Sequence, residues 1–171
     1  MATHQMPHKP ELSAVSRLII SHDAKTVTDA LPLEIIHNLK HQHRWTDLQL
    51  HRYTSSASNI SLISGLPPKH SYVHPDLQAH LIKHKIAESA IPVQREWVLP
   101  MSIGETCTLK QLCGVFDLLP ENEVVKGVDG FEWKDAKRVL AGMLSQNGMG
   151  GDGTVVYYIV QEGEVKPRQN G

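Results

Sequence analysis

The sequence predicts an α+β domain in which helices flank a mixed β-sheet. Apolar residues recur at helical spacing in some segments and alternate with polar residues in others. The order of these segments is helices, hairpin, helix, strand, helix and hairpin, which favours the α+β class. The length of 171 residues fits one domain. We assign this domain to residues 10–171 and expect residues 1–9 to form a disordered end.

The first half of the chain alternates helix and strand signals. One helix is expected after Pro10 and a second from about Asp29 to His43, with Pro32 in its first turn. The runs WTDLQLHRY and NISLISGL predict a hairpin across a polar turn. A third helix is expected to begin at Pro75, and its apolar face consists of Leu77, Leu81, Ile82 and Ile86.

The second half is expected to add a strand, a helix and a second hairpin. EWVLP predicts a strand that ends at Pro100. Thr108 and Gln111 match a capping box at the start of the next helix. The expected buried stripe of that helix consists of Leu109, Leu112, Phe116 and Leu119. Residues 121–136 are interpreted as an insertion that is mobile in part, and strands at 139–144 and 154–160 follow around a glycine-rich turn.

The last predicted strand, TVVYYIV, is apolar on both of its faces. Because side chains alternate along a strand, one face carries Val155, Tyr157 and Ile159, and the other carries Val156, Tyr158 and Val160. A strand with one wet face would alternate apolar and polar residues instead. Either this strand lies in the middle of its own domain, or something outside the chain covers it.

The charge balance does not favour a protein that holds nucleic acid alone. The 17 Lys and Arg side chains nearly balance the 18 Asp and Glu side chains, and no basic patch is visible in the sequence. The cysteines, Cys107 and Cys113, form no disulfide framework and fit a reducing compartment. We expect no secretory signal peptide, because the N-terminal residues contain no continuous apolar stretch. We also expect no membrane insertion, because no run of about 20 apolar residues exists.

The candidate ligand motifs are incomplete. The run GMGGDG at 148–153 matches G-x-G-x-x-G, but a dinucleotide site needs a helix after the glycines. A strand is expected there, so we interpret the run as a hairpin turn and expect no cofactor. His80 and His84 have metal-ligand spacing without further ligands, and we interpret them as a solvated helix face. The same interpretation, and no metal, is expected for His37, His41, His43, His70 and His74.

The cysteines and the basic residues near the C-terminus give little support for nucleophilic catalysis or for RNA binding. A Cys–His nucleophile is conceivable, but Cys113 adjoins a buried helix stripe, where a thiol is ordinarily structural. Lys166 and Arg168 could act as auxiliary RNA contacts, although Glu162 and Glu164 neutralise them nearby. The residues therefore favour a partner-binding subunit over an enzyme.

Several phrases of the sequence resemble, in order, the fungal form of the smallest tRNA-splicing endonuclease subunit, the Sen15 family. They are HNLKHQHRWTDLQLH, ISGLPPKHSYVHPDLQ, EWVLP, TLKQLCGVFD and TVVYYIVQEGEVKPRQN. The resemblance implies a fold like the C-terminal nuclease-like domain of archaeal tRNA-intron endonucleases. It also implies a heterotetramer of two catalytic and two structural subunits. That enzyme cuts precursor tRNA without a metal and leaves 2′,3′-cyclic phosphate and 5′-hydroxyl ends.

The resemblance implies that this chain is one of the non-catalytic subunits. Catalytic subunits use a Tyr, a His and a Lys, and they carry a run resembling G-x-[KR]-[FY]-G-x-[DE]-[FY] that is absent here. Lys137 falls within one residue of the place of the catalytic Lys, which we treat as coincidence. An active metal-independent RNase would instead use Lys137 with His74 or His80 and with Tyr72. A homodimeric binding module unrelated to tRNA is a further alternative.

The resemblance also implies partners for the last strand. Residues 155–160 would pair with the smaller catalytic subunit in a continuous sheet, or with a second copy of the chain when that partner is missing. The loop Gly150, Gly151, Asp152 and Gly153 corresponds to the loop by which structural subunits dock into the opposite catalytic subunit. Asp152 is its only acid, whereas the loop is usually acidic in the family. A nuclear location is expected, with the cytosol or the mitochondrial outer surface as alternatives.

Overall fold

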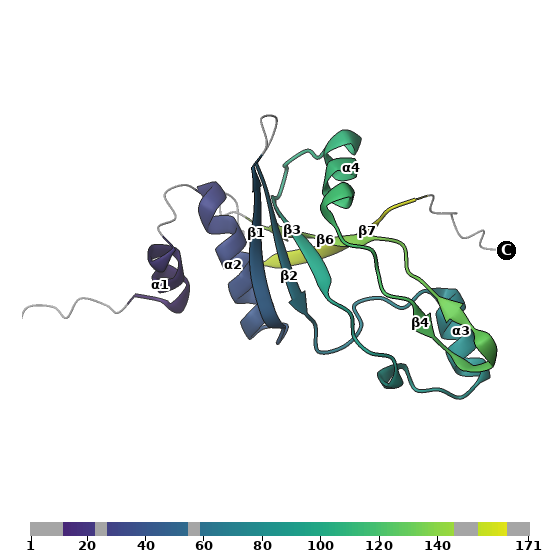
Figure 1. Cartoon of the computed structure of the whole chain (residues 1–171). Helices are drawn as coiled ribbons and strands as arrows, with labels where there is room; N and C mark the ends of the chain where they lie inside the picture. The colour runs from purple at the N-terminus through teal and green to yellow at the C-terminus, as the bar shows by residue number, and fades with distance from the viewer. Residues whose placement is uncertain (1–11, 23–26, 55–58, 146–153, 164–171) are drawn as a thin grey trace, which may run out of the picture.

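The predicted α+β fold is confirmed. The structure is a computed structural model that describes residues 12–22, 27–54, 59–145 and 154–163 (Figure 1). Along the chain the elements are α1 (Ala14–Ser21), α2 (Val27–His41), β1 (Thr46–Thr54), β2 (Asn59–Leu66), α3 (Pro75–Lys83), η1 (Glu88–Ala90), β3 (Glu96–Ser102), α4 (Leu109–Leu118), β4 (Val125–Lys126), η2 (Val128–Gly130), β5 (Glu132–Trp133), β6 (Arg138–Leu144) and β7 (Val155–Gln161).

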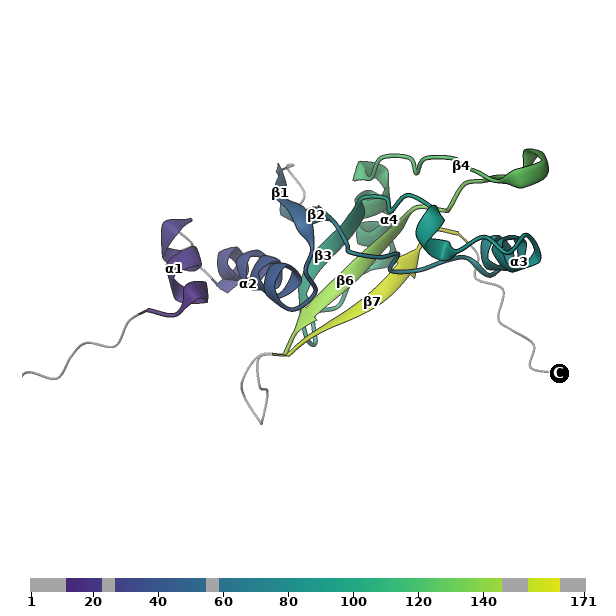
Figure 2. The ribbon, with the colours of Figure 1, turned by 90° about the horizontal axis from the view of Figure 1, so that it is seen from below.

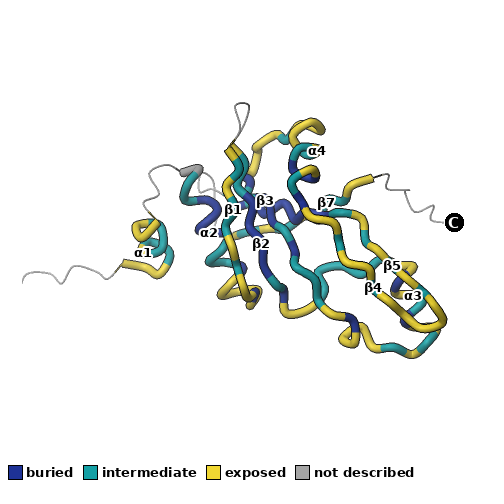
Figure 3. Tube along the Cα trace, viewed as in Figure 1, coloured by how far each residue is buried: buried dark blue, intermediate teal, exposed yellow. Residues whose placement is uncertain are grey.

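The main sheet is mixed, with strand order β1-β2-β3-β6-β7 among the described residues. Both predicted hairpins, β1–β2 and β6–β7, are present as antiparallel pairs. β3 pairs antiparallel with β2 and parallel with β6. β7 therefore lies at one edge of the sheet. Figure 3 shows the buried part of the trace running through the central strands β3 and β6.

Two helices cover opposite faces of this sheet (Figure 2). The cluster under α2 consists of Leu31, Ile35, Leu39, Trp45, Ile63, Val98, Leu140 and Leu144. The cluster under α4 consists of Leu62, Leu99, Met101, Val115, Phe116, Leu119, Val139 and Ala141. The predicted capping box starts α4: the Gln111 amide donates to Thr108 Oγ1 at 3.3 Å, and the Thr108 amide donates to Gln111 Oε1 at 2.8 Å.

A smaller unit beside the sheet combines α3 with the two-stranded sheet β4–β5 (Figure 1). Leu77, Leu81 and Ile91 form its buried cluster. Segment 121–136, interpreted from sequence as an insertion, supplies apolar side chains to that cluster, among them Phe131 and Trp133. The predicted mobility of this segment stays a prediction.

Two prolines lie farther inside their helix or strand than expected. Pro32 is inside α2, which begins at Val27 and ends at His41, so its expected place in the first turn is wrong. β3 does not end at Pro100 but continues to Ser102. The pairing of β3 with β2 ends at Val98, and the Ser102 amide donates to the Glu105 carboxylate at 3.0 Å. Because backbone groups alternate in direction along a strand, the Pro100 nitrogen faces this unpaired side, where a missing N–H costs no ladder bond.

Some apolar side chains that were expected to be buried are exposed to solvent. Leu109 is 78% exposed and Ile82 is 71% exposed, so their assignment to buried stripes is wrong. Val115 is buried on α4 instead, because the sheet contacts the middle and C-terminal turns of the helix and leaves its first residue in solvent. Cys113 is exposed, which contradicts its interpretation as a small buried hydrophobe, and Cys107 is half-buried.

Candidate functional site at the edge strand β7

The apolar strand identified from sequence, β7, is partly a core strand and partly an exposed edge. Val155 and Tyr157 pack against the cluster under α2, and Val160 packs against the cluster under α4. The other three apolar side chains are exposed: Val156 by 37%, Tyr158 by 58% and Ile159 by 42%. The explanation by a strand in the middle of its own domain is therefore wrong, because β7 lies at the edge of the sheet, although the core of the chain covers three of its six apolar side chains. A cover from outside the chain stays a prediction.

The outer edge of β7 has no strand beside it in the described part of the chain. β7 pairs with β6 in an unbroken antiparallel register, from Val155 opposite Leu144 to Gln161 opposite Arg138. Every other backbone N–H and C=O of β7 then faces outward, and such an edge is a template for pairing with another strand. Tyr158 and Ile159 lie on opposite faces at this edge.

α2 holds the inner part of β7 in place. The Tyr157 hydroxyl donates to Asn38 Oδ1 at 2.8 Å, and the His43 ring meets the Tyr157 ring edge-on at a centroid distance of 5.2 Å. Burial raises the pKa of Tyr157 well above its ordinary value. Gly142 lies opposite Tyr157 on β6, where an added Cβ would be 3.2 Å from the tyrosine ring. The sheet is thus closely packed on its α2 side.

Two further groups of predicted site residues lie outside the described residues. They are the docking-loop residues Gly150, Gly151, Asp152 and Gly153, with the rest of the GMGGDG run, and the candidate RNA contacts Lys166 and Arg168. Their roles stay predictions.

The residues of the alternative nuclease each have a structural contact, and the Tyr72 and His74 rings also meet edge-on with their centroids 6.4 Å apart. The Lys137 amine donates to the Phe116 carbonyl at 3.2 Å and lies 3.3 Å from the Glu121 carboxylate. His74 caps α3, because its Nδ1 accepts the Asp76 amide at 3.2 Å. The His80 ring stacks on Phe131, and the Tyr72 ring lies under the Arg138 guanidinium.

The histidine pair on α3 is not a simple solvated face. The His80 ring stacks on Phe131 at 3.8 Å between centroids and meets the His84 ring at 4.4 Å. His80 Nε2 is buried and has no hydrogen-bond partner. Desolvation, and then the nearby His84 and Lys83, lower the pKa of His80. Among the described residues, no group of three or more His, Cys, Asp or Glu side chains could hold a metal ion.

Sequence reasoning missed a buried ionic network between the sheet and the smaller unit. Arg138 Nε donates to Glu96 Oε2 at 3.0 Å, and Arg138 Nη1 donates to Asp135 Oδ2 at 2.8 Å. Asp135 also accepts from Trp133 Nε1 at 2.7 Å. Arg138 is 8% exposed and Glu96 is 3% exposed. Each of the two begins an apolar strand, a position that favours a solvated strand end, so the sequence carried no signal for the pair.

A second missed cluster resembles a catalytic dyad only in its distances. His51 Nε2 lies 2.9 Å from Ser64 Oγ, which also accepts from Arg95 Nη1 at 3.1 Å. Arg95 in turn pairs with the Asp47 carboxylate. Ser64 is 1% exposed, so a substrate does not reach its hydroxyl. These contacts hold strands β1, β2 and β3 together rather than forming a nucleophile.

A cavity of about 870 Å³ lies where β2 and β3 diverge. Its apolar lining consists of Leu31, Pro32, Ile60, Leu99, Pro100, Met101 and Val115. Two polar groups at its rim are already used, since Glu105 accepts the Ser102 amide and Gln111 completes the capping box of α4. The cavity thus offers apolar packing without a cluster of catalytic groups.

In the parts of the chain that the structure describes, no helix is both long and apolar enough to cross a membrane.

Known proteins match this chain along most of its length. The family model described as Sen15 protein matches residues 34–170. A Neurospora crassa protein named "Probable tRNA-splicing endonuclease subunit tsp-1" is 32% identical over 181 residues, which cover 98% of this chain and 78% of the relative. A Schizosaccharomyces pombe protein named "Probable tRNA-splicing endonuclease subunit sen15" is 28% identical over 136 residues, which cover 78% of each chain. The resemblance noted in the sequence is confirmed, and the chain belongs to the Sen15 family.

Proposed function

We propose that this chain is a non-catalytic, structural subunit of the heterotetrameric tRNA-splicing endonuclease. It supports intron excision from precursor tRNA by pairing with a catalytic subunit, and the catalytic subunits generate the 2′,3′-cyclic phosphate and 5′-hydroxyl ends. Both relatives carry the name of a tRNA-splicing endonuclease subunit. The observation that carries the pairing is the edge strand β7, which exposes Tyr158 and Ile159 beside an outward-facing backbone.

Pairing through β7 follows from the chemistry of a sheet edge. A partner strand would satisfy the outward N–H and C=O groups and extend the sheet across the two chains. Its side chains would cover Tyr158 on one face and Ile159 on the other. Full burial of a large apolar side chain contributes about 1.5–3 kcal/mol, so these two residues supply much of the apolar gain at this edge.

The contacts of the candidate nuclease residues support a non-catalytic role. A general base and a general acid must reach the same reacting phosphate. Here the Tyr72 and His74 rings are neighbours, but His74 caps α3. The Lys137 amine is bound to the end of α4, and His80 stacks on Phe131. Each side chain thus has a structural partner, and we assign the cleavage chemistry to the other subunits.

We propose the smaller catalytic subunit as the direct partner, within a complex that also holds the second structural subunit. The loop Gly150–Gly153 is proposed to contact the opposite catalytic subunit. In the absence of a partner, a second copy of the chain can occupy the same edge and form a homodimer. We further propose a nuclear location, with the cytosol and the mitochondrial outer surface as alternatives.

The experiment that tests this proposal measures molar mass by light scattering, for the chain alone and mixed with the smaller catalytic subunit of its own species. The expected result is a one-to-one complex with the wild-type chain and its loss when Tyr158→Asp and Ile159→Asp are combined. Ile82→Asp is the matched control, because Ile82 is 71% exposed on α3, away from the sheet edge.

Three outcomes separate the alternatives. A complex that survives the β7 substitutions contradicts the proposed edge. A homodimer that ignores the catalytic subunit favours the free-standing binding module. Loss of cleavage by an intact complex that carries Lys137→Ala favours an active RNase.

A further inference from the structure

Helices α2 and α3 end with the same arrangement of cations. Each has a lysine in its last turn, Lys40 in α2 and Lys83 in α3. Each is followed by a cation with positive φ, Arg44 at 57° and Lys85 at 54°. We call Lys40, Arg44, Lys83 and Lys85 the helix-end cations. The two runs that contain them, 37–44 and 80–87, hold no acidic residue.

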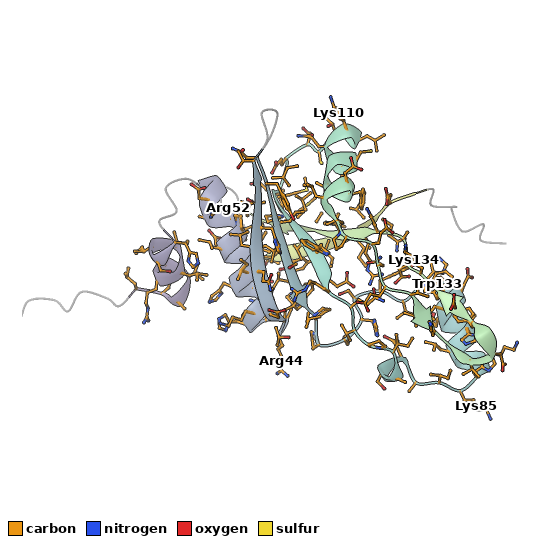
Figure 4. All side chains as sticks on the ribbon, in the orientation of Figure 1. Arg44, Arg52, Lys85, Lys110, Trp133 and Lys134 are labelled. Atoms are coloured by element: carbon orange, nitrogen blue, oxygen red, sulfur yellow. The ribbon has the colours of Figure 1, made fainter. Side chains whose placement is uncertain are left out.

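Two of the helix-end cations, Arg44 and Lys85, project toward the same side of the molecule. Figure 4 shows Arg44 projecting below the sheet at the end of α2 and Lys85 projecting below α3. In the view from below, α2 and α3 lie at opposite ends of the molecule, with the main sheet between them (Figure 2). Arg52 and Lys110 lie toward the opposite, upper end (Figure 4). Two helix ends about forty residues apart in the sequence therefore direct a cation to the same side of the molecule, from opposite ends of it.

The four cations are exposed and have no carboxylate partner among the residues that the structure describes. Arg95, Lys134, Lys137 and Arg138, by contrast, each pair with Asp or Glu. Two acidic residues lie close to the end of α3 without pairing to these cations: Asp129 lies 4.0 Å from His84, and Glu88 begins η1. The helix-end cations are thus not neutralised by ion pairs within the described residues, on a chain whose formal charge is −1.

The helix dipole explains only part of this arrangement. Each helix C-terminus carries a partial charge of roughly −0.5, which suits the lysine of the last turn. It does not explain Arg44 and Lys85, because the residue with positive φ after a helix is usually glycine. A side chain in that conformation costs about 1 kcal/mol, so the cation is held there against a backbone preference. The remaining surplus of roughly three positive charges suits a polyanion.

We propose that the helix-end cations contact the phosphate backbone of the RNA substrate. The choice of RNA rests on the proposed role in tRNA splicing, because a precursor tRNA presents the repeated charges that such a surface can neutralise. We assign the contact to phosphates rather than to base edges, because the observation behind it is the charge of four exposed side chains, which the repeated phosphate charges match. It therefore contributes affinity and orientation and is independent of the RNA sequence.

The test compares two double variants of equal charge. Arg44→Gln with Lys85→Gln removes two helix-end cations, and Arg52→Gln with Lys110→Gln removes two exposed cations at the other end. Affinity for a labelled precursor tRNA is measured by fluorescence anisotropy at several salt concentrations. Both the isolated chain and the assembled endonuclease are used, and assembly is followed by light scattering.

We expect the helix-end variant to bind the RNA several-fold more weakly, with a slope of log affinity against log salt that is smaller by about 2. Arg44→Lys with Lys85→Arg should keep the wild-type values. Equal affinities of the two double variants overturn the proposal. Loss of assembly by the helix-end variant alone also overturns it, because the surface is then a protein interface. Failure of the wild-type chain to assemble contradicts the proposed function, whereas its RNA affinity still tests this contact.

Discussion

The Tyr157 hydroxyl donates to Asn38 Oδ1 at 2.8 Å, and this bond joins the edge strand β7 to helix α2 across 119 positions of sequence. Asn38 is itself oriented, because its Nδ2 donates to Gln42 Oε1 at 2.9 Å. The neighbouring Tyr158 is 58% exposed on the other face of the strand. Two adjacent tyrosines therefore serve different purposes: one fixes the strand to its own domain, and the other is available to a partner.

Replacing Tyr157 by Phe should destabilise the chain without affecting assembly. The substitution keeps the ring in the core and removes the bond to Asn38, which costs about 0.5–1.5 kcal/mol. Urea denaturation of the isolated chain measures this loss. Tyr158→Phe is the control and should leave the unfolding free energy unchanged. Equal stability of the two variants would show that the bond to Asn38 contributes nothing.

Two glycine substitutions should change stability in opposite directions. A Cβ at Gly142 would lie 3.0 Å from Val98 Cγ1 and 3.2 Å from the Tyr157 ring, so Gly142→Ala overpacks the sheet under α2. We expect a loss of about 1–3 kcal/mol. Gly114 is inside α4 and an added Cβ meets nothing within 4 Å, so Gly114→Ala should stabilise the chain by about 0.5–1 kcal/mol. Thermal unfolding of both variants checks the opposite signs, and a shift in the same direction would contradict the packing.

The sequence was sufficient to predict the elements whose signals are local. The capping box of Thr108 and Gln111, Pro75 at the start of α3 and the apolar pattern of β7 depend on neighbouring residues, and the structure confirms each. Which side chains of β7 remain exposed was not predictable. Val160 and Tyr158 share one face of the strand, but only Val160 packs against the cluster under α4.

Features that depend on residues far apart in sequence could not be predicted. Pro100 marks a strand end by the usual rule, yet the divergence of β2 from β3 gives it an unpaired side inside β3. Glu96 and Arg138 gave no sign of pairing across 42 positions. The helix-end cations Arg44 and Lys85 likewise formed no basic run, because only the fold directs both side chains to the same side of the molecule.

Breaking the buried pair of Arg138 and Glu96 should cost far more than breaking an exposed pair. Arg138→Met leaves the Glu96 carboxylate, 3% exposed, without its cation, and such a loss costs about 3–5 kcal/mol. The double variant Arg138→Met with Glu96→Leu removes both charges and should recover part of this stability. Lys134→Met, which breaks an exposed pair with Glu121, is the control and should have a small effect. A double variant no more stable than Arg138→Met, measured by urea denaturation, would contradict the uncompensated charge as the cause.

Acidification should selectively weaken the unit formed by α3 and β4–β5. Desolvation holds the pKa of His80 below its ordinary value of 6.5, and the nearby His84 and Lys83 lower it further, while Asp129 opposes them. Since the unfolded chain then binds a proton more readily than the folded chain, the contribution of neutral His80 is present above pH 6.5 and is lost as the pH falls below it. His80 Nε2 is buried without a partner, so protonation places an unpaired charge beside Phe131.

The measurement is the unfolding free energy of the wild type and of His80→Phe between pH 7.5 and 5. Phe at this position keeps the stacking on Phe131, 3.8 Å away between ring centroids, and cannot titrate. The wild type should therefore lose more stability than His80→Phe over this range. Hydrogen exchange should place the additional loss in α3 and β4–β5 rather than in the main sheet, because α3 packs on the β4–β5 segment through Phe131. Parallel pH profiles of the two proteins would assign the acid sensitivity to other histidines.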